Sequence, residues 1–185
     1  MIRFGQLARI LAFLALGLLY NGFGQEKGAL FKVGQFEFQR PDEWKSIKPA
    51  SRMRAAQLQV PGKDGPGEVV FFYFGPSQGG GVQANVDRWL GQFEESRDRL
   101  NAKIEKRKGS DGKGSFTLVS AQGTFLSGSP FGPKTRKPDH ALFAGILEHR
   151  EGAVFVKMTG PISTVERSKE PFRSMVEKAV SQAAK

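Results

Sequence analysis

Apolar residues run without interruption from Val69 to Phe74, and most of them are β-branched or aromatic. A run of this kind is typical of a strand that is covered on both faces, so we predict a central strand here. From Val82 the apolar residues change to a helical spacing, which predicts an amphipathic helix lying on the sheet. The positions are Val82, Val86, Trp89, Leu90 and Phe93, with Leu100 as the last candidate.

Short apolar runs precede the central strand. Leu30 to Val33 and Phe36 to Phe38 predict two short strands, or one strand broken at Gly34. We expect Trp44 to lie as a lid over these first strands, because a large aromatic side chain in a loop packs well on a core. Met53 to Val60 is a further candidate strand, and the turn-rich segment after it leads into the central strand.

Two segments after the helix have little apolar pattern, and they flank a strand. Lys106 to Gly114 has no apolar period and is interpreted as a mobile loop. Phe116 to Phe125 predicts a strand with Gly123 at a bulge or bend. Gly128 to Pro138 is rich in glycine, proline and lysine, and we expect it to be open to solvent.

Ala141 to Leu147 and Ala153 to Thr159 predict a β-hairpin with its turn at Gly152. In the second of these strands Val154, Val156 and Met158 share one face, which leaves Lys157 on the other. We consider two interpretations of Lys157: a snorkelling side chain at the margin of the sheet, or a functional cation.

The last element is a helix from about Thr164, with Ser163 and Glu166 spaced as a capping box. Pro171 lies inside it and cannot donate a backbone hydrogen bond, so the helix either restarts just before Pro171 or is kinked there. Its apolar stripe comprises Val165, Phe172, Met175, Val176, Ala179 and Val180.

The start of the chain has the layout of a secretory signal peptide. Arg3 and Arg9 are followed by an apolar stretch and then by small residues up to Gly24. The apolar stretch is short for a membrane span, which needs about 20 residues. We therefore predict a signal peptide over residues 1–24 and a single domain over 25–185, which is exported to the periplasm or the extracellular space and has no transmembrane span after cleavage. The alternative is that residues 1–24 are retained as an uncleaved anchor.

The chain has no cysteine, so disulfides and thiolate metal sites are excluded. Its formal charge is +10, and removing Arg3 and Arg9 leaves +8. Most of the excess falls in two clusters. The first cluster comprises Lys103, Lys106, Arg107, Lys108 and Lys113. The second comprises Lys134, Arg136 and Lys137. For an exported chain this charge favours an envelope protein or an anionic envelope polymer as partner, rather than nucleic acid, although a merely soluble surface has the same composition.

Motifs for catalysis are weak. Ser129, Asp139 and His140 are the one local set of serine, acid and histidine, but Ser129 is misplaced for a nucleophile elbow. A hydrolase site near Ser129 and His140 is kept as an alternative. His140 and His149 lie an odd number of residues apart on one predicted strand, so they would face opposite ways and no metal site is predicted.

The glycines before the helix, Gly79, Gly80 and Gly81, match part of a dinucleotide fingerprint in the context of a strand, a turn and a helix. The following strand lacks the acidic residue that would hold a ribose, so a nucleotide cofactor is not expected. An anion site formed by the three glycines at the helix start is kept as an alternative.

Asn85, Arg88 and Gln92 recur about one turn apart on the predicted helix and form a polar strip. The strip either holds the glycine turn in place or binds a ligand, and with Lys157 it is our candidate ligand site. No catalytic residue is assigned.

The layout of a tryptophan after the opening strands, a glycine turn into a helix, two late strands and a terminal amphipathic helix resembles the PsbP-like proteins. The resemblance implies an α+β fold, an α/β/α sandwich with a mostly antiparallel sheet, and an accessory or binding role without catalysis. More narrowly, Gly80-Gly81-x-x-x-Asn85-x-x-Arg88-Trp89-x-x-Gln92 with Lys157-x-Thr159-Gly160-Pro161 is similar to exported bacterial proteins of uncharacterised function. We therefore expect an exported, non-enzymatic binding or accessory module.

Overall fold

The computed structural model describes residues 28–112, 114–128 and 132–183. The predicted signal peptide, residues 1–24, lies outside the described residues. The elements in chain order are β1 Leu30–Val33, β2 Phe36–Gln39, β3 Lys45–Ser46, β4 Ala56–Val60, β5 Gly67–Tyr73, α1 Val82–Leu90, the 3-10 helix Arg97–Arg99, β6 Lys103–Lys108, β7 Ser115–Ser127, β8 Thr135–Leu147, β9 Val154–Pro161 and α2 Ile162–Ala183.

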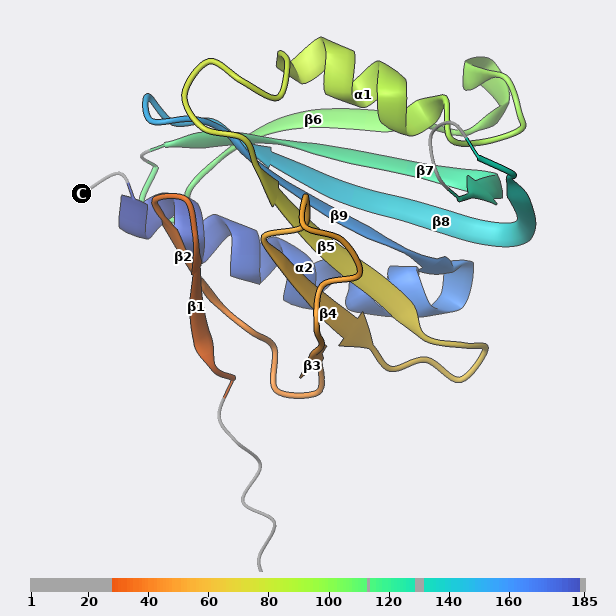
Figure 1. Ribbon diagram of the computed structural model, residues 1–185, viewed down its shortest axis with the longest axis horizontal. Helices are drawn as coiled ribbons and strands as arrows, with labels where there is room; N and C mark the ends of the chain where they lie inside the picture. The colour runs from red at the N-terminus through yellow and green to blue at the C-terminus, as the bar shows by residue number, and fades with distance from the viewer. Residues whose placement is uncertain (1–27, 113, 129–131, 184–185) are drawn as a thin grey trace, which may run out of the picture.

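The main sheet has seven strands in the order β3-β4-β5-β9-β8-β7-β6, and every neighbouring pair is antiparallel (Figure 1). The strand predicted at Val69 to Phe74 is confirmed as β5, which has β4 on one side and β9 on the other. The late hairpin is confirmed as β8 and β9. β1 and β2 pair only with each other and form a separate two-stranded sheet.

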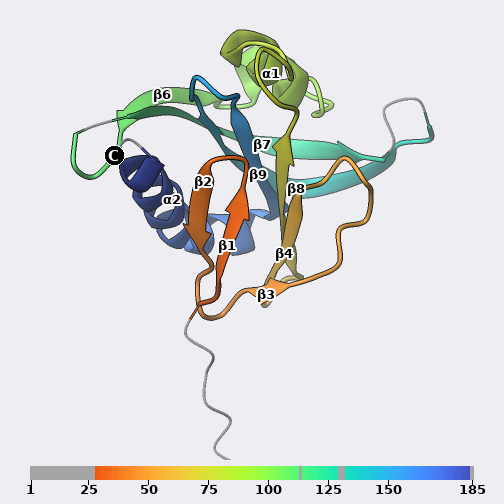
Figure 2. The same ribbon diagram turned by 60° about the vertical axis from the view of Figure 1, so that its left-hand side comes forward.

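A helix covers each face of the main sheet, α1 on one and α2 together with the β1–β2 hairpin on the other (Figures 1 and 2). The α2 side holds the larger core, in which Phe38, Phe71 and Phe172 are fully buried. Trp44 belongs to this core at 2% exposure, as predicted for a lid. The α1 side packs Val86 and Trp89 on Phe155 and its neighbours. The fold is therefore α+β with an antiparallel sheet between helices, as predicted.

The helix α1 ends at Leu90, earlier than the apolar spacing to Leu100 predicts. Gly91 has a low helix propensity, and the segment after it forms strand-like bonds with β7 instead of helical ones. The Gln92 carbonyl accepts from the Leu126 amide at 2.7 Å, and the Glu94 amide donates to the Thr124 carbonyl at 3.0 Å. Phe93 and Leu100 still reach the core, so their apolar character is explained without a longer helix.

The pairing of β7 with β8 is irregular beside this segment. The register shifts between Gly123 and Phe125, where the sequence predicts a bulge or bend, and the extra residue lies on β8, because the two residues between His140 and Lys137 lie against the single residue between Gly123 and Phe125 on β7. A side chain at Gly123 would bring its Cβ within 2.4 Å of a Glu95 carboxylate oxygen. That carboxylate accepts from the Thr124 amide at 2.8 and 2.9 Å, and this hydrogen bond lowers the pKa of Glu95.

The segment predicted as a mobile loop from Lys106 to Gly114 is instead partly a strand. β6 pairs in continuous antiparallel register with the first half of β7. Its side chains are exposed on both faces, so no apolar alternation marks it in the sequence. The predicted open segment from Gly128 to Pro138 likewise includes the start of β8 at Thr135.

The helix α2 begins at Ile162, directly after β9, and the predicted capping box does not form. The Ser163 hydroxyl donates to Asp64 at 2.6 Å, and Glu166 accepts from Gln122 at 2.6 Å. The helix does not restart at Pro171, which lies within it on the exposed face. No helix among the described residues is long and apolar enough to cross a membrane.

Candidate functional site

Lys157 lies in the middle of the sheet, not at its margin as the snorkelling interpretation holds. It belongs to β9, the fourth of the seven strands, and pairs with Val70 on β5 and Ala144 on β8. Its neighbours Val156 and Met158 point into the α2-side core, so Lys157 points to the α1 side. A charged side chain at such a position has to find polar contacts on the face of the sheet itself.

The Lys157 ammonium donates to the Gln92 side-chain oxygen at 2.9 Å and lies 5.8 Å from the centroid of the Phe125 ring. Among the described residues, no carboxylate forms an ion pair with it. Burial lowers the pKa of Lys157 from 10.5 to about 8, and the charge of Glu68 opposes this effect only in part. Lys157 is thus a half-buried cation whose direct hydrogen-bond partner is neutral.

Glu68 is the acidic residue whose charge acts on Lys157, but its carboxylate is bound to other residues. One of its carboxylate oxygens accepts from the Arg54 guanidinium at 2.8 Å and from the Gln57 amide at 2.6 Å. The side-chain oxygen of Gln57 accepts a hydrogen bond from the Ala50 backbone amide at 2.8 Å. This network ties β4 to the start of β5 and holds Glu68 in place.

An open cleft of about 290 Å³ lies beside these residues, and we call it the sheet cleft. One wall comes from the far end of the β7–β8 hairpin and the other from the segment between β3 and β5, with the end of β9 between them. It is lined by Ile47, Leu58, Gln59, Pro66, Gly67, Glu68, Phe125, Ser127, Lys137, His140, Thr159 and Gly160. Phe125, whose ring Lys157 approaches, is part of this lining, whereas Lys157 itself is not among the lining residues.

The predicted ligand-binding residues separate into two pairs. Gln92 and Lys157 meet on the face of the sheet, although Gln92 lies just after α1 and not on it. Asn85 and Arg88 lie on α1, where the Asn85 oxygen accepts from Arg88 at 2.9 Å. The side-chain partner of Arg88 is therefore the amide of Asn85.

The Asn85 amide nitrogen holds the glycine turn. It is 2.9 Å from the carbonyl oxygen of Gly79, 3.4 Å from that of Gly80 and 3.0 Å from that of Gly81. Asn85 is 2% exposed, so these contacts satisfy a buried polar group. These contacts agree with a structural role for Asn85 and Arg88, and their role in ligand binding stays a prediction.

The glycines themselves follow from local geometry. Gly79 and Gly80 have φ of +86° and +80°, values that favour glycine, and a Cβ on Gly79 would lie 2.7 Å from the Phe155 ring. The hollow beside Gly80 and Gly81 is also lined by Glu148, whose negative charge disfavours an anion there. An anion site at Gly79, Gly80 and Gly81 remains an untested prediction.

Of the two residues predicted for a hydrolase site, His140 lines the sheet cleft. Ser129 lies outside the described residues. Asp139 and His140 are neighbours on β8, and no hydrogen bond or ion pair joins their side chains within the described residues, so Asp139 does not orient the imidazole. The Nδ1 atom of His140 lies 2.8 Å from the Pro138 carbonyl oxygen. The prediction that His149 lies on the same strand as His140 is wrong, because β8 ends at Leu147. Within residues 28–112, 114–128 and 132–183, no group of three metal-ligating side chains occurs.

Sequence reasoning missed most of the lining of the sheet cleft, including Glu68, Phe125 and Lys137. The available signal was a charged residue within or beside each of two apolar strands, Glu68 in β5 and Lys157 in β9. The sequence carries no mark of their adjacency, because residues 68 and 157 are brought together only by the pairing of β5 with β9.

No protein-family model and no curated protein sequence matches the chain. Among solved structures, it is similar to cyanobacterial PsbP (CyanoP) from Synechocystis, with a TM-score of 0.53 and 12% identity, over 85% of this chain and 94% of that one. A protein of unknown function from Pseudomonas aeruginosa aligns with a TM-score of 0.41 and 15% identity, over 81% of this chain and 94% of that one. The first similarity shows a PsbP-like fold. The narrower resemblance through the pattern from Gly80 to Gln92 stays a prediction.

Proposed function

We propose that the chain is an exported, non-enzymatic binding module of the cell envelope, and that its sheet cleft binds an anionic group of an envelope component. The observation that carries the proposal is Lys157, a half-buried ammonium that is bonded to a neutral amide and lies 5.8 Å from the centroid of Phe125, a ring that lines the sheet cleft. Burying a cation without a charged partner is unfavourable, and a bound carboxylate or phosphate would relieve that cost.

The charges around the sheet cleft favour an anion over a cation. Lys137 and His140 line it and Lys157 adjoins it. The one acidic residue of the lining, Glu68, is bound to Arg54 and Gln57. Phe125 and Ile47 add apolar surface, so the cleft suits a ligand that joins an acidic group to a small apolar or sugar-like body.

A binding role is supported over hydrolysis by the contacts of the hydroxyl and the imidazole in the cleft. Ser127 is a potential nucleophile in the lining, but its hydroxyl is directed to the Thr135 carbonyl at 3.4 Å and not to His140. A general base has to contact the nucleophile that it activates. This pair does not make such a contact.

The test uses the mature chain, with inorganic phosphate and citrate as probes, and follows backbone amides by NMR during titration. We expect shifts centred on Phe125, His140 and Lys157, and weaker binding above about pH 8 as the ammonium loses its proton. Lys157→Met should abolish binding, whereas Lys32→Met, a change of an exposed lysine on β1, should leave it unchanged. Equal binding by the Lys157→Met variant would refute the site.

A further inference from the structure

β6 forms one edge of the seven-stranded sheet, and its outer side is open. Its six residues all pair with β7, and within the described part of the chain no other backbone group bonds to them. The opposite edge strand, β3, has only two residues. β6 is therefore the long free edge of the sheet, and it presents a row of unpaired N–H and C=O groups.

The sequence of β6 keeps this edge regular. It contains no proline and its register with β7 has no bulge, so the usual interruptions of an edge strand are missing. It carries Lys103, Lys106, Arg107 and Lys108 against the single acid Glu105. Ile104, with 46% exposure, is one of the few large apolar side chains that the described chain leaves open to water.

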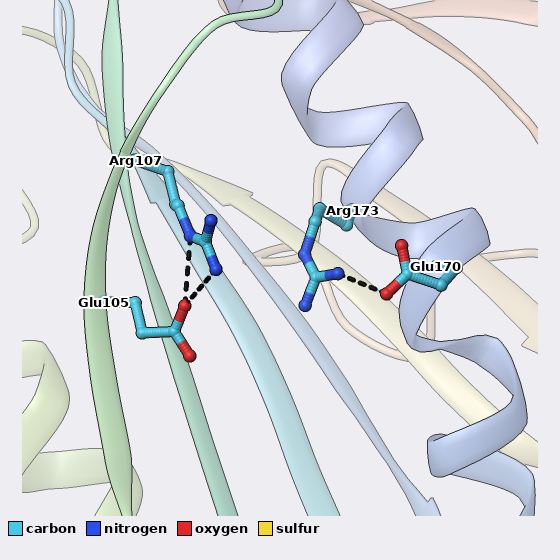
Figure 3. Close-up of polar contacts among 4 residues, drawn as sticks. All are labelled: Glu105, Arg107, Glu170 and Arg173. Atoms are coloured by element: carbon cyan, nitrogen blue, oxygen red, sulfur yellow. Dashed lines mark hydrogen bonds and ion pairs between the residues drawn. The ribbon is translucent and has the colours of Figure 1, made fainter.

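Local ion pairs leave the lysines of β6 available. Glu105 is bound to Arg107 on the same strand, with the Arg107 Nε 3.0 Å from the Glu105 carboxylate (Figure 3). On the helix α2, Glu170 is likewise bound to Arg173. Both carboxylates are thus engaged by arginines. Among the described residues, no acid pairs with the three lysines of β6, which are Lys103, Lys106 and Lys108.

We propose that β6 binds an extended acidic segment of a partner protein, which adds to the sheet as a further strand. Main-chain hydrogen bonds would supply affinity, and the alternating side chains would supply specificity. On one face of the added strand, acidic residues would meet Lys106 and Lys108, with Ile104 as an apolar contact on the same face. Charge selects this occupant over a second copy of the chain, because two β6 strands would each bring a net charge of +3 (four basic residues and one acidic).

Lysines on an edge strand also prevent aggregation, and the proposal depends on separating that role from recognition. The probe is a synthetic peptide of about eight residues that alternates glutamate with valine. We expect it to slow hydrogen exchange at those β6 amides that do not bond to β7. A lysine–valine peptide should not bind, and the acidic peptide with methylated backbone nitrogens should lose its affinity.

Variants locate the site and separate it from the sheet cleft. The double variant Lys106→Glu, Lys108→Glu should weaken acidic-peptide binding by at least about tenfold, whereas Lys32→Glu, an exposed change on β1, should not. Lys157→Met should bind the peptide as the parent does. An unchanged thermal melt checks that each variant is folded.

Three results would overturn the proposal. They are unchanged binding by the double variant, protection that maps away from β6, and equal binding by the methylated peptide. The last of these would show recognition by side-chain charge alone, as for an anionic polymer.

Discussion

The fold should become more stable as the pH rises above 8, and Lys157 should be the cause. Its pKa is about 8 in the folded chain, against an ordinary value of 10.5. Between these two values the unfolded chain keeps the proton and the folded chain does not, so the free energy of unfolding increases with pH. Below about pH 8 both states are protonated, and the cost of burying the charge is present in full.

The magnitude follows from the width of that window. At about 1.4 kcal/mol per pH unit, the interval between pH 8 and 10.5 corresponds to roughly 3 kcal/mol. Lys157→Met removes this cost but also removes the hydrogen bond to Gln92, which contributes about 1 kcal/mol. The variant should therefore be about 2 kcal/mol more stable than the parent near pH 7.

Urea unfolding followed by tryptophan fluorescence measures the difference at several pH values between about 7 and 10. We expect the advantage of Lys157→Met to shrink steadily above about pH 8, because the parent loses its buried charge. Lys106→Met is the matched control, since the exposed Lys106 should give a constant difference near zero. A constant gap between the Lys157→Met variant and the parent over this range would show that the ammonium is not desolvated, and the reasoning would fail.

Three further predictions concern the core, the glycine turn and export. Trp89→Ala should destabilise the domain by about 3 to 5 kcal/mol in urea unfolding, because Trp89 is 5% exposed on the buried face of α1, and a loss below about 1 kcal/mol would place it outside the core. Asn85→Ala should cost about 1 to 3 kcal/mol by removing the hydrogen bonds from the buried Asn85 side chain to the glycine turn, and faster hydrogen exchange at the start of α1 should accompany it; unchanged exchange there would show that Asn85 does not hold the turn. Secreted protein should begin near Gln25 by N-terminal sequencing, and a membrane-bound product that retains residues 1–24 would contradict cleavage.

The strands that the sequence predicted well are those with continuous apolar runs. β5 and the buried parts of β7, β8 and β9 contain such runs because both of their faces contact a core. β6 was missed for the opposite reason. Its two faces are exposed and charged, and its strand conformation depends on pairing with β7, which local pattern does not record.

The site was predicted only in part, because its residues come from distant elements. Lys157 and Gln92 were chosen separately, as an odd charge and as part of a polar strip, and they meet at 2.9 Å. Asn85 and Arg88 belonged to the same predicted strip, but they face the glycine turn. The helical spacing of Asn85, Arg88 and Gln92 predicted one polar strip, and this prediction is wrong for Gln92 because the helix ends at Leu90.

The early end of α1 is also the reason that the sheet has a free face for a site. A helix of nine residues is about 14 Å long, whereas the thirteen residues of β8 span about 43 Å, so α1 covers only part of the strands beneath it. After Gly91 the chain leaves the helix and bonds to β7 beside the register shift between Gly123 and Phe125, which brings Gln92 over the sheet toward Lys157. Had the helix continued to Leu100, these backbone groups would have bonded within it, and Lys157 would have no amide partner from this segment. The early end of the helix at Leu90 thus leaves part of this face of the sheet uncovered and brings Gln92 to Lys157.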